Sequence, residues 1–384
     1  MMNKAHTNSK YIRNMAAVVS LAIAAGTPAL FAGQKSGEKE PFARAHLAMT
    51  QGAFASPDHA NRSVAQHLEE TYRDALEIYR TKAVKDPAYV PKIAQSLIIL
   101  GTLYHETERL QEAEQAYQEA LQIYRALGKR DAGYQVEVVA ALNNLGVLYH
   151  ETQRLEQAEQ AFVEALANFR SHVRKDAETP LLHEASTASN LGTLYQETKR
   201  LEPAERAYQE ALQAYRALAK CDPVYRTEVA NTAHVLALLY HHMQRLEKAE
   251  QALRESLDNY RALRVEDPTY GAEVAMALNN LGVVYQESRR AATAERVFTE
   301  AIAACRSLVK QDPSYLADMA ITLTNLGTVL HTMHRLEEAE KTYREAFTSF
   351  AALAKKDPEY QPYVALIRNH LARLRYDTLR LEAI

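Results

Sequence analysis

The histidines are the side chains of this sequence most able to bind a metal ion, and two local clusters deserve a test. His241 and His242 are adjacent, so on a helix they point about 100° apart and cannot chelate one ion together. His331 and His334 are three residues apart and can share a helix face, but no nearby cysteine or aspartate completes a ligand set. The sequence therefore predicts surface histidines, with no metal site and no cofactor.

Nucleophilic and phosphate-binding chemistry finds no better support. Cys221 and Cys305 are 84 residues apart, and in a chain of stacked helices we expect them to be too distant for a disulfide bond. Neither a GxxxxGK[ST] phosphate loop nor an HExxH zinc motif is present. Paired carboxylates such as Glu112 and Glu114 are typical of a solvated helix face. We therefore expect a protein that is not an enzyme.

The composition limits both the fold and the partner. The 384 residues include only 12 glycines and 12 prolines, well below the average of about 7 % and 5 %. An all-β fold with many turns needs more of both residues. A hydrophobic fraction of 47 % indicates a folded chain, and a net charge of −3 argues against a protein that binds nucleic acid by neutralising phosphates.

The N-terminal 32 residues have the pattern of an export signal. Lys4, Lys10 and Arg13 precede the apolar run 15–25, and the segment 1–32 contains no acidic residue. The run is too short for a transmembrane helix of about 20 residues. We predict a signal peptide over 1–32, cleaved after Ala29 or Ala32, and an exported protein, periplasmic or secreted. The alternative is an uncleaved segment that tethers the protein to a membrane.

A short motif, Leu-Gly-x-Leu-Tyr and its variants, recurs at a nearly constant spacing. Its second residue, here named the glycine position, is the reference from which offsets are counted. The steps between successive copies are 45 residues, with one step of 46. An Arg follows eight residues after every copy, and an Asp thirty residues after. The six glycine positions are Gly101, Gly146, Gly192, Ala237, Gly282 and Gly327. A period of this length predicts a repeat protein.

Each repeat has the apolar pattern of two helices. Over 142–149, apolar and small residues recur at helical spacing, and a matching stripe runs over 158–169. A missing side chain at Gly146 lets the two helices approach closely. Asp-Pro pairs between repeats predict an N-cap followed by proline at the first helical position. The one extra residue, before Gly192, is expected in a turn at 178–181.

The sequence is thus divided into a linker, two caps and an array. We predict a flexible linker over 33–55, an N-terminal capping helix over 56–86, six repeats over 87–356 and a C-terminal capping helix over 357–384. The fold class is all-α, a solenoid of antiparallel helix pairs with about 45 residues in each repeat.

The segments Leu-Asn-Asn-Leu-Gly-x-Leu-Tyr (142–149) and Ala-Glu-x-Ala-Phe-x-Glu-Ala-Leu (158–166) carry a family resemblance. They resemble the tetratricopeptide repeat family, and in particular its long-repeat branch, typified by kinesin light chain. The usual unit of that family has 34 residues. The resemblance implies a right-handed superhelical array that binds another protein, commonly an extended segment on the concave face formed by the first helices.

The candidate binding residues lie on the first helices, opposite the Leu-Gly-Tyr stripe. Amides, hydroxyls, imidazoles and carboxylates dominate this face, which has no Lys or Arg. The candidates are Asn143, Asn144, Val147, His150, Glu151, Asn190, Thr193, Glu197, His241, Asn279, Asn280, Gln286, Glu287 and Asn325. The resemblance implies that the asparagines hydrogen-bond the backbone of a bound peptide. The alternative is that they bond to adjacent helices, because buried polar groups need partners.

The predicted partner is another protein or a peptide segment. With acceptors and no fixed positive charge, the face favours neutral or basic segments over acidic ones. Two other functions stay open. The first is an assembly protein that associates with itself, and the second is a regulatory subunit of a larger complex, held at a membrane through residues 15–32.

Overall fold

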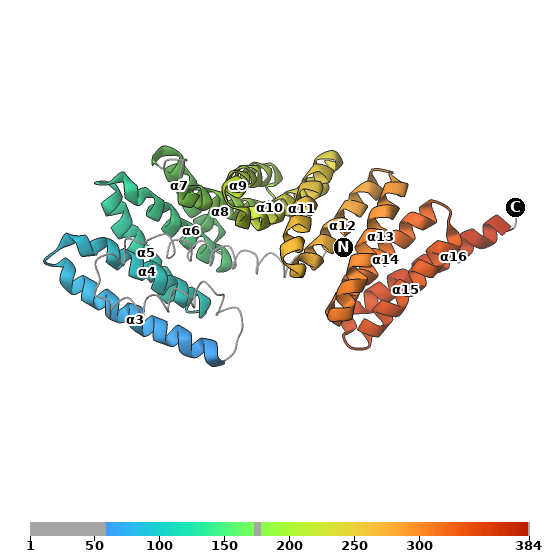
Figure 1. Ribbon diagram of the computed structural model, residues 1–384, viewed down its shortest axis with the longest axis horizontal. Coiled ribbons are helices and arrows are strands. Elements are labelled where there is room, and N and C mark those ends of the chain that lie inside the picture. The colour runs from blue at the N-terminus through green and yellow to red at the C-terminus, as the bar shows by residue number, and fades with distance from the viewer. Residues whose placement is uncertain (1–58, 173–177, 383–384) are drawn as a thin grey trace. The chain divides into compact units, whose positions relative to one another are not determined.

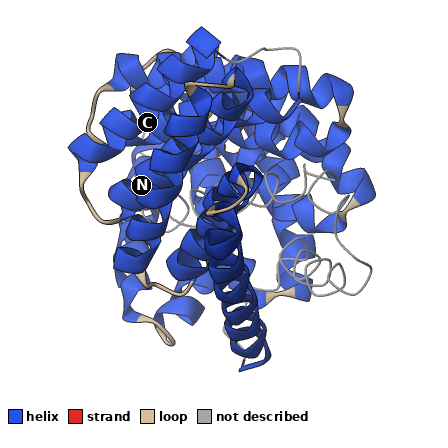
Figure 2. Cartoon of the chain, turned by 90° about the vertical axis from the view of Figure 1, so that its left-hand side faces the viewer, coloured by secondary structure: helices blue, strands red, loops and turns tan. Residues whose placement is uncertain are grey.

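The computed structural model describes residues 59–172 and 178–382. The predicted signal peptide (1–32) and linker (33–55) lie outside these ranges. Every regular element in the described ranges is an α-helix or a 3₁₀ turn, as Figure 2 shows. Among these helices, none is both long enough and apolar enough to cross a membrane.

The chain forms two compact units, one ending at Leu218 and the other beginning at Ala219. The helices of the first unit are α3 (His59–Ala83), α4 (Val90–Glu106), α5 (Leu110–Gly128), α6 (Gln135–Glu151), α7 (Leu155–His172), α8 (Glu178–Glu197) and α9 (Leu201–Cys221). Those of the second unit are α10 (Arg226–His242), α11 (Leu246–Glu266), α12 (Gly271–Glu287), α13 (Ala291–Gln311), α14 (Leu316–Thr332), α15 (Leu336–Ala354) and α16 (Gln361–Glu382).

Within each unit, consecutive helices form pairs that follow the sequence repeat (Figure 1). The first helix of a pair is even-numbered and contains the glycine position, and the second is odd-numbered. In the second unit, for example, α12 packs on α13, and α13 packs in turn on the next first helix, α14. The expected all-α fold of helix pairs with 45-residue repeats is confirmed.

The glycine position is where the two helices of a pair come closest. A Cβ atom on Gly146 would lie 2.4 Å from Cε1 of Phe162, whose ring is almost completely buried. In the next pair, a Cβ atom on Gly192 would lie 2.8 Å from the ring of Tyr208. Carbon atoms in contact are about 3.5–4.0 Å apart, so no side chain fits between the helices at these positions.

The turn inside each pair contains a residue in the left-handed region. In the first pair this is Glu108, with φ 61°. Its N–H donates to the carbonyl of His105, and the N–H of Arg109 donates to the carbonyl of Tyr104 at 2.8 Å, which is the Schellman pattern that ends a helix. The equivalent residues of the other five pairs have φ between 57° and 60°. This turn could not be predicted from the usual sequence signal, because none of the six residues is a glycine.

The junction between repeats is a short 3₁₀ turn. The Asp86 carboxylate caps the turn Pro87–Tyr89 by accepting a 3.0 Å bond from the Ala88 N–H, and α4 begins only at Val90. The predicted capping by Asp-Pro is thus correct for the residue type, but the element that is capped is the 3₁₀ turn. The tyrosine of the turn packs on the preceding second helix, with Tyr89 and Tyr79 centroids 6.0 Å apart.

One local expectation is wrong. Residues 178–181 do not form a turn, because α8 begins at Glu178 and contains all four of them. With 20 residues against 17 in α6, α8 takes the longer spacing before Gly192 into its first helical turns. Residues 173–177 lie outside the described ranges.

Candidate interaction surface

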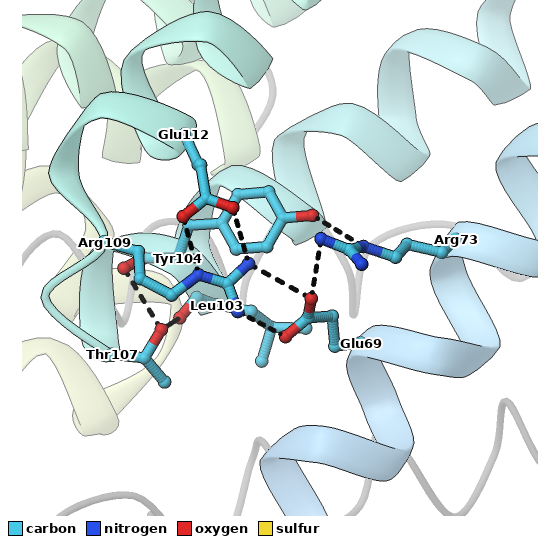
Figure 3. Close-up of polar contacts among 7 residues, drawn as sticks. All are labelled: Glu69, Arg73, Leu103, Tyr104, Thr107, Arg109 and Glu112. Atoms are coloured by element: carbon cyan, nitrogen blue, oxygen red, sulfur yellow. Dashed lines mark hydrogen bonds and ion pairs between the residues drawn. The ribbon is translucent and has the colours of Figure 1, made fainter.

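Arginine side chains form ion pairs that connect neighbouring second helices. Arg109 donates two bonds to the carboxylate of Glu69, at 2.7 and 3.1 Å, and two to Glu112 at its own helix start (Figure 3). Its guanidinium carbon lies 4.2 Å from the ring centroid of Tyr104, whose hydroxyl accepts a 3.1 Å bond from Arg73. Hydrogen bonding to Glu69 raises the pKa of Arg109, so this side chain stays charged.

The same arginine–glutamate contact recurs along both units. An Arg at offset +8 bonds to a Glu at offset +13 of the preceding repeat, which places the two on neighbouring second helices. The pairs are Arg154–Glu114, Arg200–Glu159, Arg290–Glu250 and Arg335–Glu295. The arginines were predicted to recur, and the recurring Glu is the sequence signal that identifies their partners. This surface is a structural tie between repeats.

Histidine–carboxylate pairs connect neighbouring first helices. His105 Nε2 lies 2.7 Å from Glu151 Oε2, and His150 Nε2 lies 2.6 Å from Glu197 Oε2. In the second unit, the pairs are His241–Glu287 at 2.9 Å and His331–Asp377 at 2.9 Å. His331 is therefore tied to α16 and does not act with His334.

The sequence records which repeats carry such a pair. Wherever offset +4 is His, offset +5 of the next repeat is acidic. Where offset +4 is Gln, at Gln196 and Gln286, the next repeat has His242 and Thr332 instead. The imidazoles and carboxylates of this row thus vary together within one chain, as expected of side chains that bond to each other.

Asparagines form a second link between first helices. Asn190 Nδ2 donates to Asn143 Oδ1 at 3.0 Å, and Asn325 Nδ2 donates to Asn279 Oδ1 at 3.0 Å. Asn280 Nδ2 is 3.0 Å from Nε2 of His234 in the same arrangement. In every case offset −3 of one repeat meets offset −2 of the next. These bonds are the inter-helix contacts that the sequence left as an alternative to peptide binding.

The fourteen predicted side chains all lie on first helices but differ in exposure. Seven are buried, and they are Asn143, Asn144, Val147, His150, Asn190, Thr193 and Asn280. The other seven are partly or well exposed, and they are Glu151, Glu197, His241, Asn279, Gln286, Glu287 and Asn325. Thr193 is bonded at 3.0 Å to the Tyr208 hydroxyl of the paired second helix. The contacts account for a structural role, and a role in peptide binding stays a prediction.

Burial shifts the pKa of several titratable groups on the first helices. It lowers the pKa of His183 and of His234 to about 4, so both rings are neutral near pH 7. Desolvation also raises the pKa of Glu137 and Glu273 at the starts of α6 and α12. No three His, Cys, Asp or Glu side chains of the described residues come together as a metal ligand set.

The repeat pattern matches known family models over more than half of the chain. The model described as tetratricopeptide repeat matches residues 92–171, 228–307 and 273–352, and a second model with the same description matches residues 185–220. No curated protein sequence matches the chain significantly.

Several solved structures are similar to this chain. BtubC (BKLC) from P. vanneervenii is 22 % identical with a TM-score of 0.51, and the match covers 64 % of this chain and 92 % of that one. The apo form of RapI is 14 % identical with a TM-score of 0.48, covering 83 % and 99 %. A Podosopora anserina putative kinesin light chain is 15 % identical with a TM-score of 0.42, covering 56 % and 95 %. At these identities the likeness concerns the fold alone.

Proposed function

The chain belongs to the tetratricopeptide repeat family, and we propose that it is a non-catalytic scaffold that binds an extended segment of another protein along its first helices. Repeats of this family indicate protein–protein interaction. The segment would lie across the first-helix row, defined by offsets −6, −3, +1, +4 and +5 of each repeat. This row is the concave face that the resemblance implies.

Unused amide donors are the observation that carries the proposal. The Oδ1 of Asn143 accepts a hydrogen bond from Asn190, and its buried Nδ2 has no hydrogen-bond partner among the described residues. The Oδ1 of Asn279 accepts a hydrogen bond from Asn325, and its Nδ2 has only a long contact, 3.5 Å, with Oδ1 of Asn280. A buried donor without a partner costs about 1–3 kcal/mol. A backbone carbonyl of a bound segment would supply the missing bond at Asn279, whose side chain is partly exposed, whereas Asn143 is 0 % exposed and is not in reach of the segment.

Charge supports a neutral or basic segment. None of the side chains at the five offsets from 95 to 332 is Lys or Arg, and the row contains Glu151, Glu197 and Glu287. A segment that adds positive charge gains Coulomb attraction here, and an acidic one loses it. No cofactor or metal has a part in this mode of binding.

Photo-crosslinking tests where the partner sits. A benzoylphenylalanine placed at Val283, on the first-helix row, should capture the partner in its native extract. The same residue at Val265, which is 86 % exposed at the end of a second helix, is the matched control and should not capture it. Capture at Val265 alone would place the partner elsewhere and overturn the proposal.

A single-atom change then tests the amide donor. Asn279→Asp keeps an oxygen for the bond from Asn325 and removes the Nδ2 donor, so affinity for the captured partner should fall about tenfold. Asn259→Asp on the second helix α11 is the control, because the Nδ2 of Asn259 bonds within its own helix and is not part of the first-helix row. Equal affinities of both variants would show that Asn279 does not contact the segment.

Export is proposed on the N-terminal pattern alone. We infer that the mature protein starts near Gly33, because residues 1–32 combine three positive charges with an interrupted apolar core. Intact-mass analysis of the native protein should show the loss of 1–32. Retention of this segment, with the protein in the membrane fraction, would favour a tethered subunit instead. Mass by light scattering that grows with concentration would favour the self-associating alternative.

A further inference from the structure

The last helix, α16, is held firmly by one face. Val364, Ile367 and Leu374 are almost fully buried against the second helix α15. Tyr363 stacks on Phe350 of α15 with ring centroids 4.9 Å apart. The position of α16 within its unit is thus fixed by packing, and its opposite face has no second helix to cover it in the described structure.

The surface by which a first helix pairs with its own second helix departs from the repeat in α16. Offset −4 from the glycine position is Leu or Ala in the six repeats, and offset +3 is Tyr or Leu, whereas α16 has Arg368 and Arg375 there. Ala372 occupies the glycine position between them. A further second helix packing here would bury two guanidinium groups, so this surface of α16 does not fit the pairing that the other first helices make.

The arginines of α16 are not compensated by carboxylates. On the second helices, arginines such as Arg306 bond to a Glu of the neighbouring repeat. Arg373, Arg375 and Arg380 are all exposed and have no ion pair with any side chain that the structure describes. The one nearby carboxylate with a described side chain on α16, Asp377, is 2.9 Å from His331.

Large apolar side chains lie among these charges. Tyr376 is 66 % exposed and Leu379 is 65 % exposed. Tyr376 is three residues from Arg373 and four from Arg380, so all three share one helix surface. Tyr and Arg side chains are among the residues that most often dominate the binding energy of protein interfaces. We call Arg373, Arg375, Tyr376, Leu379 and Arg380 the α16 patch.

We propose that the α16 patch is a docking surface for an acidic segment of a partner protein that also presents an apolar side chain to Tyr376 and Leu379. Carboxylates of the segment would take the positions that glutamates take around the arginines of the second helices. Arg373 and Tyr376 stand at offsets +1 and +4 from Ala372, so the α16 patch continues the first-helix row past residue 332 and selects the opposite charge there. The inference is argued from the side chains of α16 alone and does not depend on the proposed function.

Other occupants fit the α16 patch less well. A second copy docking the same face would bring arginine against arginine, which is repulsive. A membrane-bound helix inserts one continuous apolar face into the bilayer. The continuous apolar face of α16, with Val364, Ile367 and Leu374, is already packed on α15 and is not available to lipid.

Fluorescence anisotropy with a designed peptide tests the proposal. The probe is a labelled 16-residue peptide of alternating Glu with Phe or Leu, titrated with the full chain at low salt, beside a version in which Lys replaces Glu. The acidic probe should bind, and more weakly as salt rises, because exposed charges are screened. The Lys version should not bind.

The variants locate the binding. Arg373→Gln, Arg375→Gln and Arg380→Gln together should weaken the acidic probe about tenfold or more. The control triple, Arg80→Gln, Arg125→Gln and Arg170→Gln, changes the net charge equally on exposed positions of the other unit and should leave affinity within about twofold. Circular dichroism melting should show both triples folded, and Tyr376→Ala should also weaken the probe.

The contrary results are distinct. No binding of the acidic probe, or equal losses in the two triples, would overturn the proposal. Unchanged affinity for the acidic probe in both Tyr376→Ala and the α16 triple would also overturn it. Binding of phosphatidylglycerol vesicles that depends on the α16 arginines, without binding of the probe, would assign the patch to lipid instead. Asn279→Asp should leave probe binding unchanged, so failure here and failure of the first-helix proposal are separable.

Discussion

Replacing Gly146 by Ala tests the close approach of paired helices. The new Cβ would lie 2.4–2.8 Å from three ring carbons of Phe162, so the ring must move by about 1 Å to reach normal contact. In a close-packed core such overpacking costs about 1–3 kcal/mol. Ala improves helix propensity by about 1 kcal/mol, so the net loss of stability is about 0–2 kcal/mol. Gly146→Leu has a similar gain in helix propensity but a larger clash, and should cost more.

The chain itself contains the compensated version of this change. In the repeat where the glycine position is Ala237, the residue at offset +16 is Leu253, whereas the other five repeats have Tyr or Phe there. Phe162→Leu alone should cost about 1–2 kcal/mol by leaving a void. With Gly146→Ala the added methyl fills part of that void. We expect the double variant to be more stable than the sum of the singles by about 1 kcal/mol or more.

Urea unfolding followed by circular dichroism measures the cycle, with hydrogen exchange to locate the loss. The second measurement matters because repeat arrays lose structure locally before they unfold completely. Gly128→Ala is the matched control, since its Cβ would meet only the flexible end of Gln135. Additive single effects, or a Gly146→Ala variant more stable than the parent, would show that the Gly146–Phe162 contact does not limit helix approach.

Three further changes probe other features. His183 has a folded pKa of about 4, below its unfolded value, so the stability that its neutral ring allows is present above about pH 6.5 and is lost as pH falls toward 4. At pH 5 the loss is about 2 kcal/mol, and His183→Leu should flatten the fall in urea midpoint between pH 7 and 5; an unchanged slope would refute this. Gln153 has φ 60°, so Gln153→Gly should raise the free energy of unfolding by up to about 1 kcal/mol, measured by thermal unfolding; a lower melting temperature would contradict the left-handed turn. His331→Gln with Asp377→Thr copies the residue types at 286 and 332, and should cost less than the two single changes added together, by about 0.5–1.5 kcal/mol in a double-mutant cycle.

Much of the fold follows from local sequence patterns. The 45-residue spacing of Gly146 and its counterparts, the helical stripes and the capping Asp before each 3₁₀ turn are all set by residues near one another in the chain. Helix periodicity and capping depend on the nearest few residues, so one sequence is enough to recognise them. The exceptions are also local. Glu108 and its five equivalents end their helices in the left-handed region without a glycine, and the hydrogen bonds that close these turns join residues within five positions of each other.

What the sequence did not settle is which side chains of different repeats touch. It placed Asn143 and His150 on one face of a first helix, but whether that face bonds to a ligand or to the next helix depends on residues about 46 positions away. Only the folded stack brings Asn190 and Glu197 to within 3.0 Å of them. The same holds for α16, where the sequence contains four arginines and the tertiary structure decides that three of them form no ion pair with a described carboxylate, because Asp377 pairs with His331. Periodicity determines the face on which a side chain lies, and packing between repeats determines what that face meets.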